Sequence, residues 1–208
     1  MYIQITTKCN MHCAHCGYSC DKNGRHMKME TVRKAMKIAE DRGEYIFIGG
    51  GEPTLHPRFW DIMAMAMAAS EERVGIVTNG SITEKALILA KMDHAGLICA
   101  ELSQDEFHDP INPRVVQAFK THRNTSANIV AAGRAIDWGW DDGCICEGPM
   151  IDPEGKIWAC GCKTEQFGTV DDPQIPDDYY DRESLCSEKY RAFLREQQYD
   201  ESEALAEA

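Results

Sequence analysis

Residues 2–16, YIQITTKCNMHCAHC, join a strand pattern directly to a cluster of thiols. Residues 2–6 alternate in polarity and include β-branched side chains, which is typical of a β-strand. Cys9, Cys13 and Cys16 follow with the spacing Cys-x3-Cys-x2-Cys. In a reducing compartment, clustered cysteines usually bind metal or take part in catalysis. The stretch therefore predicts a strand that leads into a metal-binding or catalytic loop.

Three thiolates in one loop favour an iron–sulfur cluster. They leave one iron of a [4Fe–4S] cluster without a protein ligand, and that iron can bind an external amine and carboxylate. Zinc is the alternative, because a Cys-x2-Cys pair also suits zinc. A structural zinc site needs a fourth ligand, which Cys20, His12 or His15 would have to supply.

Farther along the chain, strand and helix patterns alternate. The strands expected after the first lie at residues 45–48, 74–77, 97–102 and 127–131. The expected helices lie at residues 29–39, 59–67, 81–95 and 115–120, and the third begins with a capping box of Ser81 and Glu84. This alternation predicts an α/β fold with a parallel sheet, in which ligands gather at the carboxyl ends of the strands.

A glycine-rich turn follows the second expected strand. Gly49, Gly50 and Gly51 let the backbone approach a ligand closely and expose its N–H and C=O groups. Glu52 adds a carboxylate suited to an ammonium group, and Pro53 stiffens the exit from the turn. The alternative is an ordinary turn from strand to helix.

Together these segments resemble the radical S-adenosylmethionine (SAM) superfamily. In that family, Cys-x3-Cys-x2-Cys follows the first strand of a partial (β/α) barrel, and a Gly-Gly-Glu-Pro motif after the second strand recognises the amino group of SAM. Residues 78–80 resemble the third-strand motif, and residues 102–105 resemble the segment that reaches the SAM ribose and carboxylate. The resemblance covers residues 1 to about 135 and implies a SAM-binding [4Fe–4S] cluster on the three clustered cysteines.

The resemblance also implies which residues contact SAM. The matching positions are His15, Gly50, Gly51, Glu52, Pro53, Asn79, Ser103 and Arg134. His15 departs from the family, which usually has an aromatic residue near the adenine at this position, so the adenine contact stays open. About five strands are expected before residue 136, where the family commonly has six. The barrel is therefore expected to be shortened, with a wide mouth.

A second group of cysteines follows the expected barrel. Residues 150–151 and 156–158 predict a β-hairpin that turns near Gly155. The cysteines around and after it are Cys144, Cys146, Cys160, Cys162 and Cys186. The Gly-x4-Cys spacing resembles the SPASM/twitch extension of some radical SAM enzymes, which implies an auxiliary [4Fe–4S] cluster. Cys160 is the first choice as ligand, the other four are candidates, and a structural zinc is the alternative.

The expected organisation is a radical SAM core at residues 1–135, a twitch-like cysteine-rich extension at residues 136–195 with a short helix at 185–194, and an acidic flexible tail at residues 196–208. The net charge is −12, with twelve acidic and four basic residues from Asp171 onward. Without a basic stripe, an extended nucleic acid is an unfavourable partner. No apolar run reaches membrane-spanning length and no signal-peptide pattern begins the sequence, so we expect a cytoplasmic protein.

The resemblance implies a chemistry. A [4Fe–4S] cluster would receive an electron from a donor such as flavodoxin or ferredoxin and would cleave SAM to a 5′-deoxyadenosyl radical, which abstracts hydrogen from a substrate. The expected substrate is a peptide or protein side chain, with help from the auxiliary cluster, and a nucleoside, nucleotide or other small molecule is the alternative. A zinc-binding interaction module without catalysis is a remote alternative. The class of reaction (oxidoreductase, transferase or isomerase) is left open by the sequence.

Overall fold

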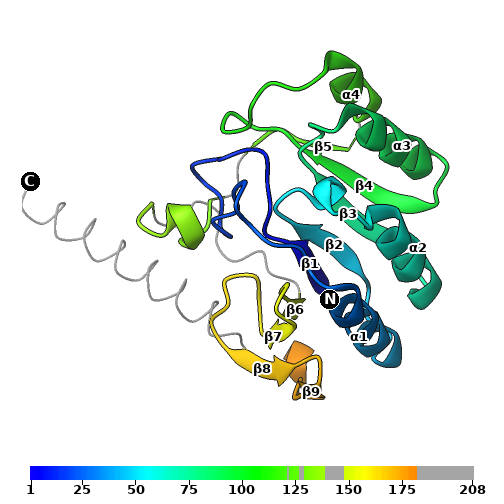
Figure 1. Ribbon diagram of the computed structural model, residues 1–208, viewed down its shortest axis with the longest axis vertical. Coiled ribbons are helices and arrows are strands. Elements are labelled where there is room, and N and C mark those ends of the chain that lie inside the picture. The colour runs from blue at the N-terminus through cyan, green and yellow to red at the C-terminus, as the bar shows by residue number, and fades with distance from the viewer. Residues whose placement is uncertain (121, 127–128, 139–147, 182–208) are drawn as a thin grey trace, which may run out of the picture.

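The computed structural model describes residues 1–120, 122–126, 129–138 and 148–181. Within these residues, nine strands form one sheet in the order β5-β4-β3-β2-β1-β6-β7-β8-β9 (Figure 1). The strands are β1 (Tyr2–Thr6), β2 (Phe47–Gly50), β3 (Val74–Thr78), β4 (Ile98–Ser103), β5 (Arg123–Asn124), β6 (Met150–Ile151), β7 (Lys156–Trp158), β8 (Gln166–Thr169) and β9 (Asp172–Pro173). The helices are α1 (Met29–Asp41), α2 (Phe59–Ala69), α3 (Thr83–His94) and α4 (Pro113–Ala118), with short 3-10 turns at Pro53–Leu55, Gly133–Ala135 and Tyr179–Asp181.

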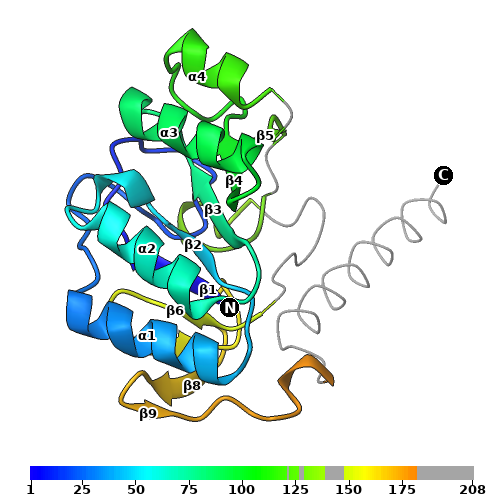
Figure 2. The same ribbon diagram turned by 90° about the vertical axis from the view of Figure 1, so that its right-hand side faces the viewer.

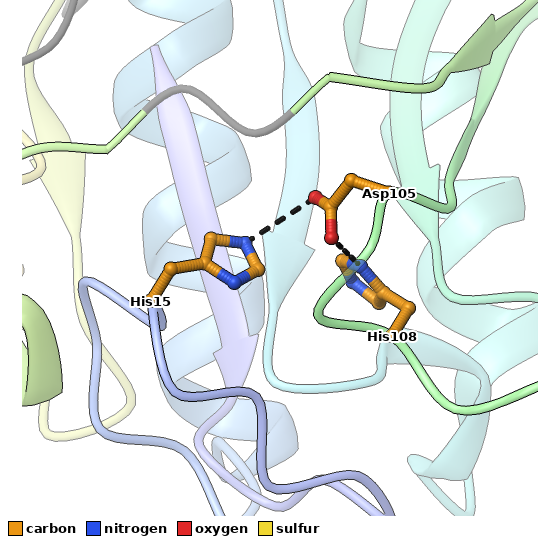
Figure 3. Close-up of side chains that lie close together, drawn as sticks. All are labelled: His15, Asp105 and His108. Carbon is orange, nitrogen blue, oxygen red and sulfur yellow. Dashed lines mark hydrogen bonds and ion pairs between the residues drawn. The ribbon is translucent and has the colours of Figure 1, made fainter.

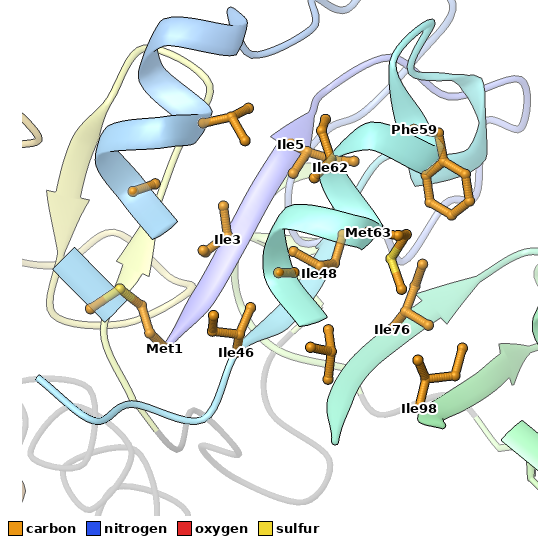
Figure 4. Packing of buried hydrophobic residues seen from close by; sticks show 14 of the residues in the cluster. Met1, Ile3, Ile5, Ile46, Ile48, Phe59, Ile62, Met63, Ile76 and Ile98 are labelled. Atoms are coloured by element: carbon orange, nitrogen blue, oxygen red, sulfur yellow. The ribbon is translucent and has the colours of Figure 1, made fainter. Parts of the chain in front are cut away.

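Strands β1 to β5 form the expected parallel α/β unit. Each pairs in parallel with its neighbour, and α1 to α4 cover one face of the sheet (Figures 1 and 2). The core lies between this face and the helices, where Ile3, Ile48 and Ile76 are fully buried (Figure 4). Because side chains alternate along a strand, Tyr2 and Gln4 point to the opposite face, which the helices leave uncovered.

The expected hairpin is confirmed, and it extends the same sheet. Strand β6 pairs in parallel with β1, and β7, β8 and β9 follow in antiparallel order. The turn between β6 and β7 depends on Gly155, whose φ is +80°, and on the Asp152 carboxylate, which accepts hydrogen bonds from the backbone N–H groups of Glu154 and Lys156. The hairpin thus lies beside the strand that leads into the cysteine loop.

Two local predictions were wrong. The structure has its fifth strand at Arg123–Asn124, and residues 129–131 of the expected range 127–131 do not form a strand, while residues 127–128 lie outside the described residues. Residues 129–132 instead pass close to the cysteine loop, where Val130 lies beside Gly17. The capping box is absent, since the Ser81 hydroxyl pairs with the Asn10 side chain and α3 starts without a side-chain cap. In both places a contact with the cysteine loop outweighs local preference.

The expected helix at residues 185–194 and the acidic tail at residues 196–208 lie outside the described residues. None of the helices in the described part of the chain is long and apolar enough to cross a membrane.

Candidate active site

The loops that follow β1, β2, β3 and β4 meet at one end of the sheet and enclose a cavity of about 220 Å³. The predicted cluster and SAM residues that line it are Cys9, Cys13, Cys16, His15, Gly50, Gly51, Asn79, Ser103 and Arg134. The other two predicted SAM residues, Glu52 and Pro53, are buried and are not part of this lining. Four loops separated by helices therefore converge as the parallel sheet requires.

Arg134 braces the loop that carries the cysteines. Its guanidinium donates hydrogen bonds to the backbone carbonyl oxygens of Cys13 and Cys20, both at 2.9 Å, and its own N–H donates to the Cys16 carbonyl at 3.1 Å. The preceding Gly133 has φ +56°, and a Cβ there would lie 2.5 Å from the Cys16 carbonyl oxygen. The sequence predicted Arg134 as a SAM contact. Its hydrogen bonds to the cysteine loop were not predicted, because Arg134 lies 121 positions from Cys13 along the chain.

The four thiols of the loop differ in their electrostatics. Burial raises the pKa of Cys9, and it raises the pKa of Cys13 to about 11. A hydrogen bond with the Cys20 thiol lowers the pKa of Cys16, and the same bond raises the pKa of Cys20. Cys20 lines the cavity with the other three and is almost fully buried, a placement that the sequence left open. Metal ligation requires thiolates, so a bound cation would have to offset the burial of Cys9 and Cys13.

Glu52 ties the end of β2 to the end of β3. Its Oε1 accepts hydrogen bonds from Thr54 N (3.0 Å), Thr54 Oγ1 (2.5 Å) and Thr78 Oγ1 (2.9 Å), and its Oε2 accepts one from Asn79 N at 2.7 Å. Burial raises the pKa of this carboxyl group, while the four donors favour its ionised form. Glu52 therefore orders the turns that follow β2 and β3 without itself lining the cavity.

The glycines of this turn allow close contact with the cysteine loop. Gly50 has φ +132°, and a Cβ there would lie 2.1 Å from the Thr6 carbonyl oxygen. A Cβ at Gly51 would lie 2.3 Å from the Lys8 carbonyl oxygen. Because real Cβ atoms do not approach so closely, the β2 turn packs against the start of the cysteine loop only with glycine at these positions.

Comparison with known families identifies the family to which the chain belongs. Residues 3–136, more than half of the chain, match the family model described as Radical SAM superfamily. The chain belongs to the radical SAM superfamily. The match covers the strands and loops that enclose the 220 Å³ cavity. The protein is therefore an enzyme, and radical SAM membership implies a [4Fe–4S] cluster and SAM as its cofactors.

Several curated proteins are similar in sequence. Mycofactocin maturase MftC of Mycobacterium tuberculosis (strain ATCC 25618 / H37Rv) is 34% identical over 142 residues, which cover 64% of this chain and 34% of the relative. A probable GTP 3',8-cyclase of Methanocaldococcus jannaschii is 28% identical over 139 residues, or 65% of this chain and 44% of the relative. The chain thus matches about a third of the length of the mycofactocin maturases.

Solved radical SAM structures share the fold. BtrN, in a crystal structure with AdoMet and 2-DOIA, superimposes with a TM-score of 0.60 at 15% identity, covering 92% of this chain and 83% of that one. Streptococcus suis SuiB bound to S-adenosylmethionine gives a TM-score of 0.52 at 11% identity, covering 92% and 67%. Together with the parallel sheet, these likenesses confirm the predicted α/β fold of the radical SAM type.

The residues present fit the cofactors that radical SAM membership implies. Cys9, Cys13 and Cys16 line a single cavity, and three thiolates are the donor set of a cluster with an open iron. The fourth thiol of the loop, Cys20, is hydrogen-bonded to Cys16. The backbone N–H of Met11 and the side-chain amide of Asn79 donate toward Cys9 Sγ at 3.4 and 3.7 Å. Hydrogen bonds of this kind to ligand sulfurs tune a cluster's potential.

His15 belongs to a polar group at the rim of the radical SAM site. Its Nε2 lies 3.4 Å from Asp105 Oδ2, while His108 Nδ1 lies 2.8 Å from Asp105 Oδ1 (Figure 3). Burial lowers the pKa of His15, and Phe107 packs on its ring at 4.8 Å. The sequence predicted His15 but missed Asp105 as its partner. His56, in contrast, does not belong to this group. Its buried ring is hydrogen-bonded to the Met27 carbonyl and to the Arg58 N–H, which is in keeping with a structural role.

Of the predicted auxiliary ligands, the structure describes two. Cys160 is fully buried, and its Sγ lies 3.3 Å from Thr164 Oγ1. Cys162 is half-buried and lines two other cavities beside the cysteine loop. Cys144, Cys146 and Cys186 lie outside the described residues.

Proposed function

We propose that Cys9, Cys13 and Cys16 hold a [4Fe–4S] cluster with which this enzyme cleaves SAM and abstracts hydrogen from a substrate. The observation that carries the proposal is the single cavity that these thiols share with the backbone of Gly50 and Gly51. When bound, the cluster supplies the electron that splits SAM into methionine and a 5′-deoxyadenosyl radical.

The chain's own residues would hold this chemistry in place. Arg134 fixes the loop backbone, so the thiols keep their relative positions. The Gly50–Gly51 backbone, Ser103 and His15 face the cavity, where they would bind SAM. Glu52 is fully buried outside the cavity lining and already accepts four hydrogen bonds, so part of its contribution is to order the turn.

As substrate we propose a peptide or protein side chain. The likeness to a mycofactocin maturase over 64% of this chain supports this choice. The cysteine-rich residues 136–195 would form a twitch-like extension with an auxiliary [4Fe–4S] cluster, or a zinc in its place, on ligands drawn from Cys144, Cys146, Cys160, Cys162 and Cys186. The core would end near residue 135, and residues 196–208 would form a flexible acidic tail.

A nucleotide is the second candidate substrate. It is favoured by the likeness to a probable GTP 3',8-cyclase, which covers 65% of this chain. In either case we propose a low-potential electron donor such as flavodoxin or ferredoxin, and a cytoplasmic location in which thiols stay reduced.

The test is anaerobic reconstitution with iron and sulfide, followed by dithionite and SAM, with 5′-deoxyadenosine measured by mass spectrometry. We expect product from the parent and none from single Ala variants of Cys9, Cys13 or Cys16. The matched control is Cys99→Ser, which removes a half-buried thiol outside the cysteine loop and should keep both iron and product. A parent protein that assembles its cluster yet forms no 5′-deoxyadenosine would refute the catalytic assignment.

A further inference from the structure

A larger cavity, of about 700 Å³, adjoins the one at the cysteines. The two share the side chains or backbone of Tyr2, His15, Gly17 and Tyr18 as a common wall. The uncovered face of the sheet forms one side of the larger cavity, and residues of the extension, including Cys162, form another. Its volume lies within the range of about 300–1,000 Å³ that ligand pockets occupy. A molecule bound there would lie next to the proposed cluster and SAM.

A row of aromatic rings forms the floor of this cavity. The ring of Tyr2 is roughly parallel to those of Tyr18 and Phe47, with centroids 5.8 and 5.9 Å away and interplanar angles of 25° and 18°. Tyr45 continues the row, its ring centroid 6.5 Å from that of Phe47. Burial raises the pKa of Tyr2, and raises that of Tyr45 to about 12, so both phenols stay uncharged near neutral pH.

Two glycines give this row its place on the sheet. A Cβ at Gly49 would lie 2.0 Å from the Tyr2 hydroxyl oxygen, and a Cβ at Gly75 would lie 2.4 Å from Phe47 Cδ2. Any other residue at either position would push the aromatic rings away from the strands. The chain thus keeps side chains off two central strands where the rings cover them, which is how a flat apolar surface is built.

The charge of the lining narrows the class of ligand. Among the described residues that line the cavity there is no lysine or arginine, and Glu44 is the one carboxylate. The Met1 ammonium, which also lines the cavity, is already paired with Glu44 at 3.5 Å and donates to the Tyr45 carbonyl at 2.6 Å. A phosphate-bearing ligand would have to compete with Glu44 for this cation, and desolvating a phosphate without a cation partner is costly. An uncharged planar ring, in contrast, can stack on the floor.

We propose that this cavity binds the substrate through an uncharged aromatic ring that stacks on Tyr2, Phe47 and Tyr45. The inference rests on the proposed function, and it favours an aromatic side chain over a nucleotide. Such a ring comes either from a peptide or from a free small molecule. The common wall at Tyr2 and Tyr18 places the bound ring beside the site where SAM would be cleaved.

The test uses the anaerobically reconstituted enzyme in its oxidised, diamagnetic state. Dissociation constants of N-acetyl-tyrosinamide, N-acetyl-leucinamide, 4-ethylphenol and GTP are measured by saturation-transfer NMR titration. We expect the tyrosine amide to bind and the leucine amide and GTP not to compete with it. Tighter binding of the tyrosine amide than of 4-ethylphenol identifies a peptide side chain as the source of the ring, and equal binding identifies a free aromatic molecule.

Two variants test whether the tyrosine amide binds on the aromatic floor of the cavity. Phe47→Leu keeps an apolar side chain but removes a ring, so we expect the tyrosine amide to bind about two- to tenfold more weakly. Trp60→Leu is the matched control, because it removes a ring that is 37% exposed on α2, and we expect no change. Equal binding of the leucine amide, competition by GTP, no binding of either aromatic probe, or an unaffected Phe47→Leu variant would each overturn the proposal.

Formation of 5′-deoxyadenosine without substrate is measured on the same parent samples. If the parent forms it but binds no aromatic probe, the cavity assignment fails while the proposed function stands. If the parent forms none, the proposed function fails, whatever the probes do.

Discussion

The cysteine loop (residues 9–20) and the turn at residues 160–163 both carry closely spaced cysteines, yet they are built differently. In the loop, all four thiols line one cavity, and side chains from distant parts of the chain, Arg134 and Asn79, bond to it. In the turn, Cys160 is buried against Thr164 while Cys162 lines other cavities. Spacing alone therefore does not define a metal site, and what distinguishes the loop is the support it receives from elsewhere in the fold.

Removing the three loop thiols should have the largest effect. We expect the triple variant of Cys9, Cys13 and Cys16 to Ala to lose all 5′-deoxyadenosine formation. If the extension holds its own cluster, the parent should bind roughly eight irons per chain, as two four-iron clusters. The triple variant should then keep about half of this iron and a brown colour, measured by iron analysis and absorbance.

Other outcomes of that experiment would change how the extension cysteines are interpreted relative to the cysteine loop. A colourless triple variant with one tightly held zinc would mean that the extension is a structural zinc site. A variant without either metal would mean that the extension cysteines bind none.

Glu52→Gln tests whether the β2 turn binds SAM or only supports the loop. In the variant, an NH2 group replaces one carboxylate oxygen and faces a donor that now bonds to Glu52, so one hydrogen bond is lost. We expect SAM to bind about tenfold more weakly, which corresponds to a loss of about 1.4 kcal/mol in binding free energy. Equilibrium SAM binding and the cluster's absorbance spectrum measure this effect. We expect an unchanged spectrum. Parent-like SAM affinity with lowered thermal stability would restrict Glu52 to ordering the turn.

Arg134→Lys weakens the hydrogen bonds that hold the cysteine loop and that the turn at residues 160–163 does not receive from Arg134. Lysine keeps the charge but cannot hold two carbonyls with a planar fork, so we expect a loss of about 1–3 kcal/mol in unfolding free energy and faster loss of iron to a chelator. The control is Arg25→Lys, because the exposed Arg25 guanidinium pairs with Glu154 at the surface. Equal chelation rates in both variants would show that the brace does not protect the cluster.

Two single variants of the turn should give the smallest effects. Cys160 is fully buried, so Cys160→Ala should cost about 1 kcal/mol of unfolding free energy. Cys162 is half-buried, so Cys162→Ala should change it by less than about 0.5 kcal/mol. Denaturant titration of both compares them directly. A larger loss at Cys162 would indicate that this thiol does more than pack, as a metal ligand would.

The features that were predictable from the sequence are those encoded locally. Residues 2–16 predicted β1 and the cysteine loop. The glycine-rich turn predicted a close approach of the backbone to a ligand, and the structure shows a close approach of Gly50 to the Thr6 carbonyl oxygen. The misplaced fifth strand and the absent capping box share a cause. In each, residues with sound local preferences contact the cysteine loop instead, as Val130 and Ser81 do.

The site partners that the sequence did not reveal are long-range pairs. Arg134 meets Cys13 across 121 positions, and Asp105 meets His15 across a comparable gap. No spacing rule connects such residues, because their proximity follows from the order of strands in the sheet. The aromatic floor is of the same kind, since Tyr2 and Phe47 become neighbours only when β1 and β2 pair in register.

Strand β1 has β2 on one side and β6 on the other, and the Tyr2 N–H donates to the Pro149 carbonyl at 2.8 Å. A version of the enzyme cut back to residues 1–136 would leave that side of β1 as an open edge, with unpaired N–H and C=O groups. Such edges recruit strands from other molecules and promote aggregation. Anyone who trims this enzyme to a minimal catalyst would therefore need to give β1 a substitute neighbour, whatever the cysteines of the extension prove to bind.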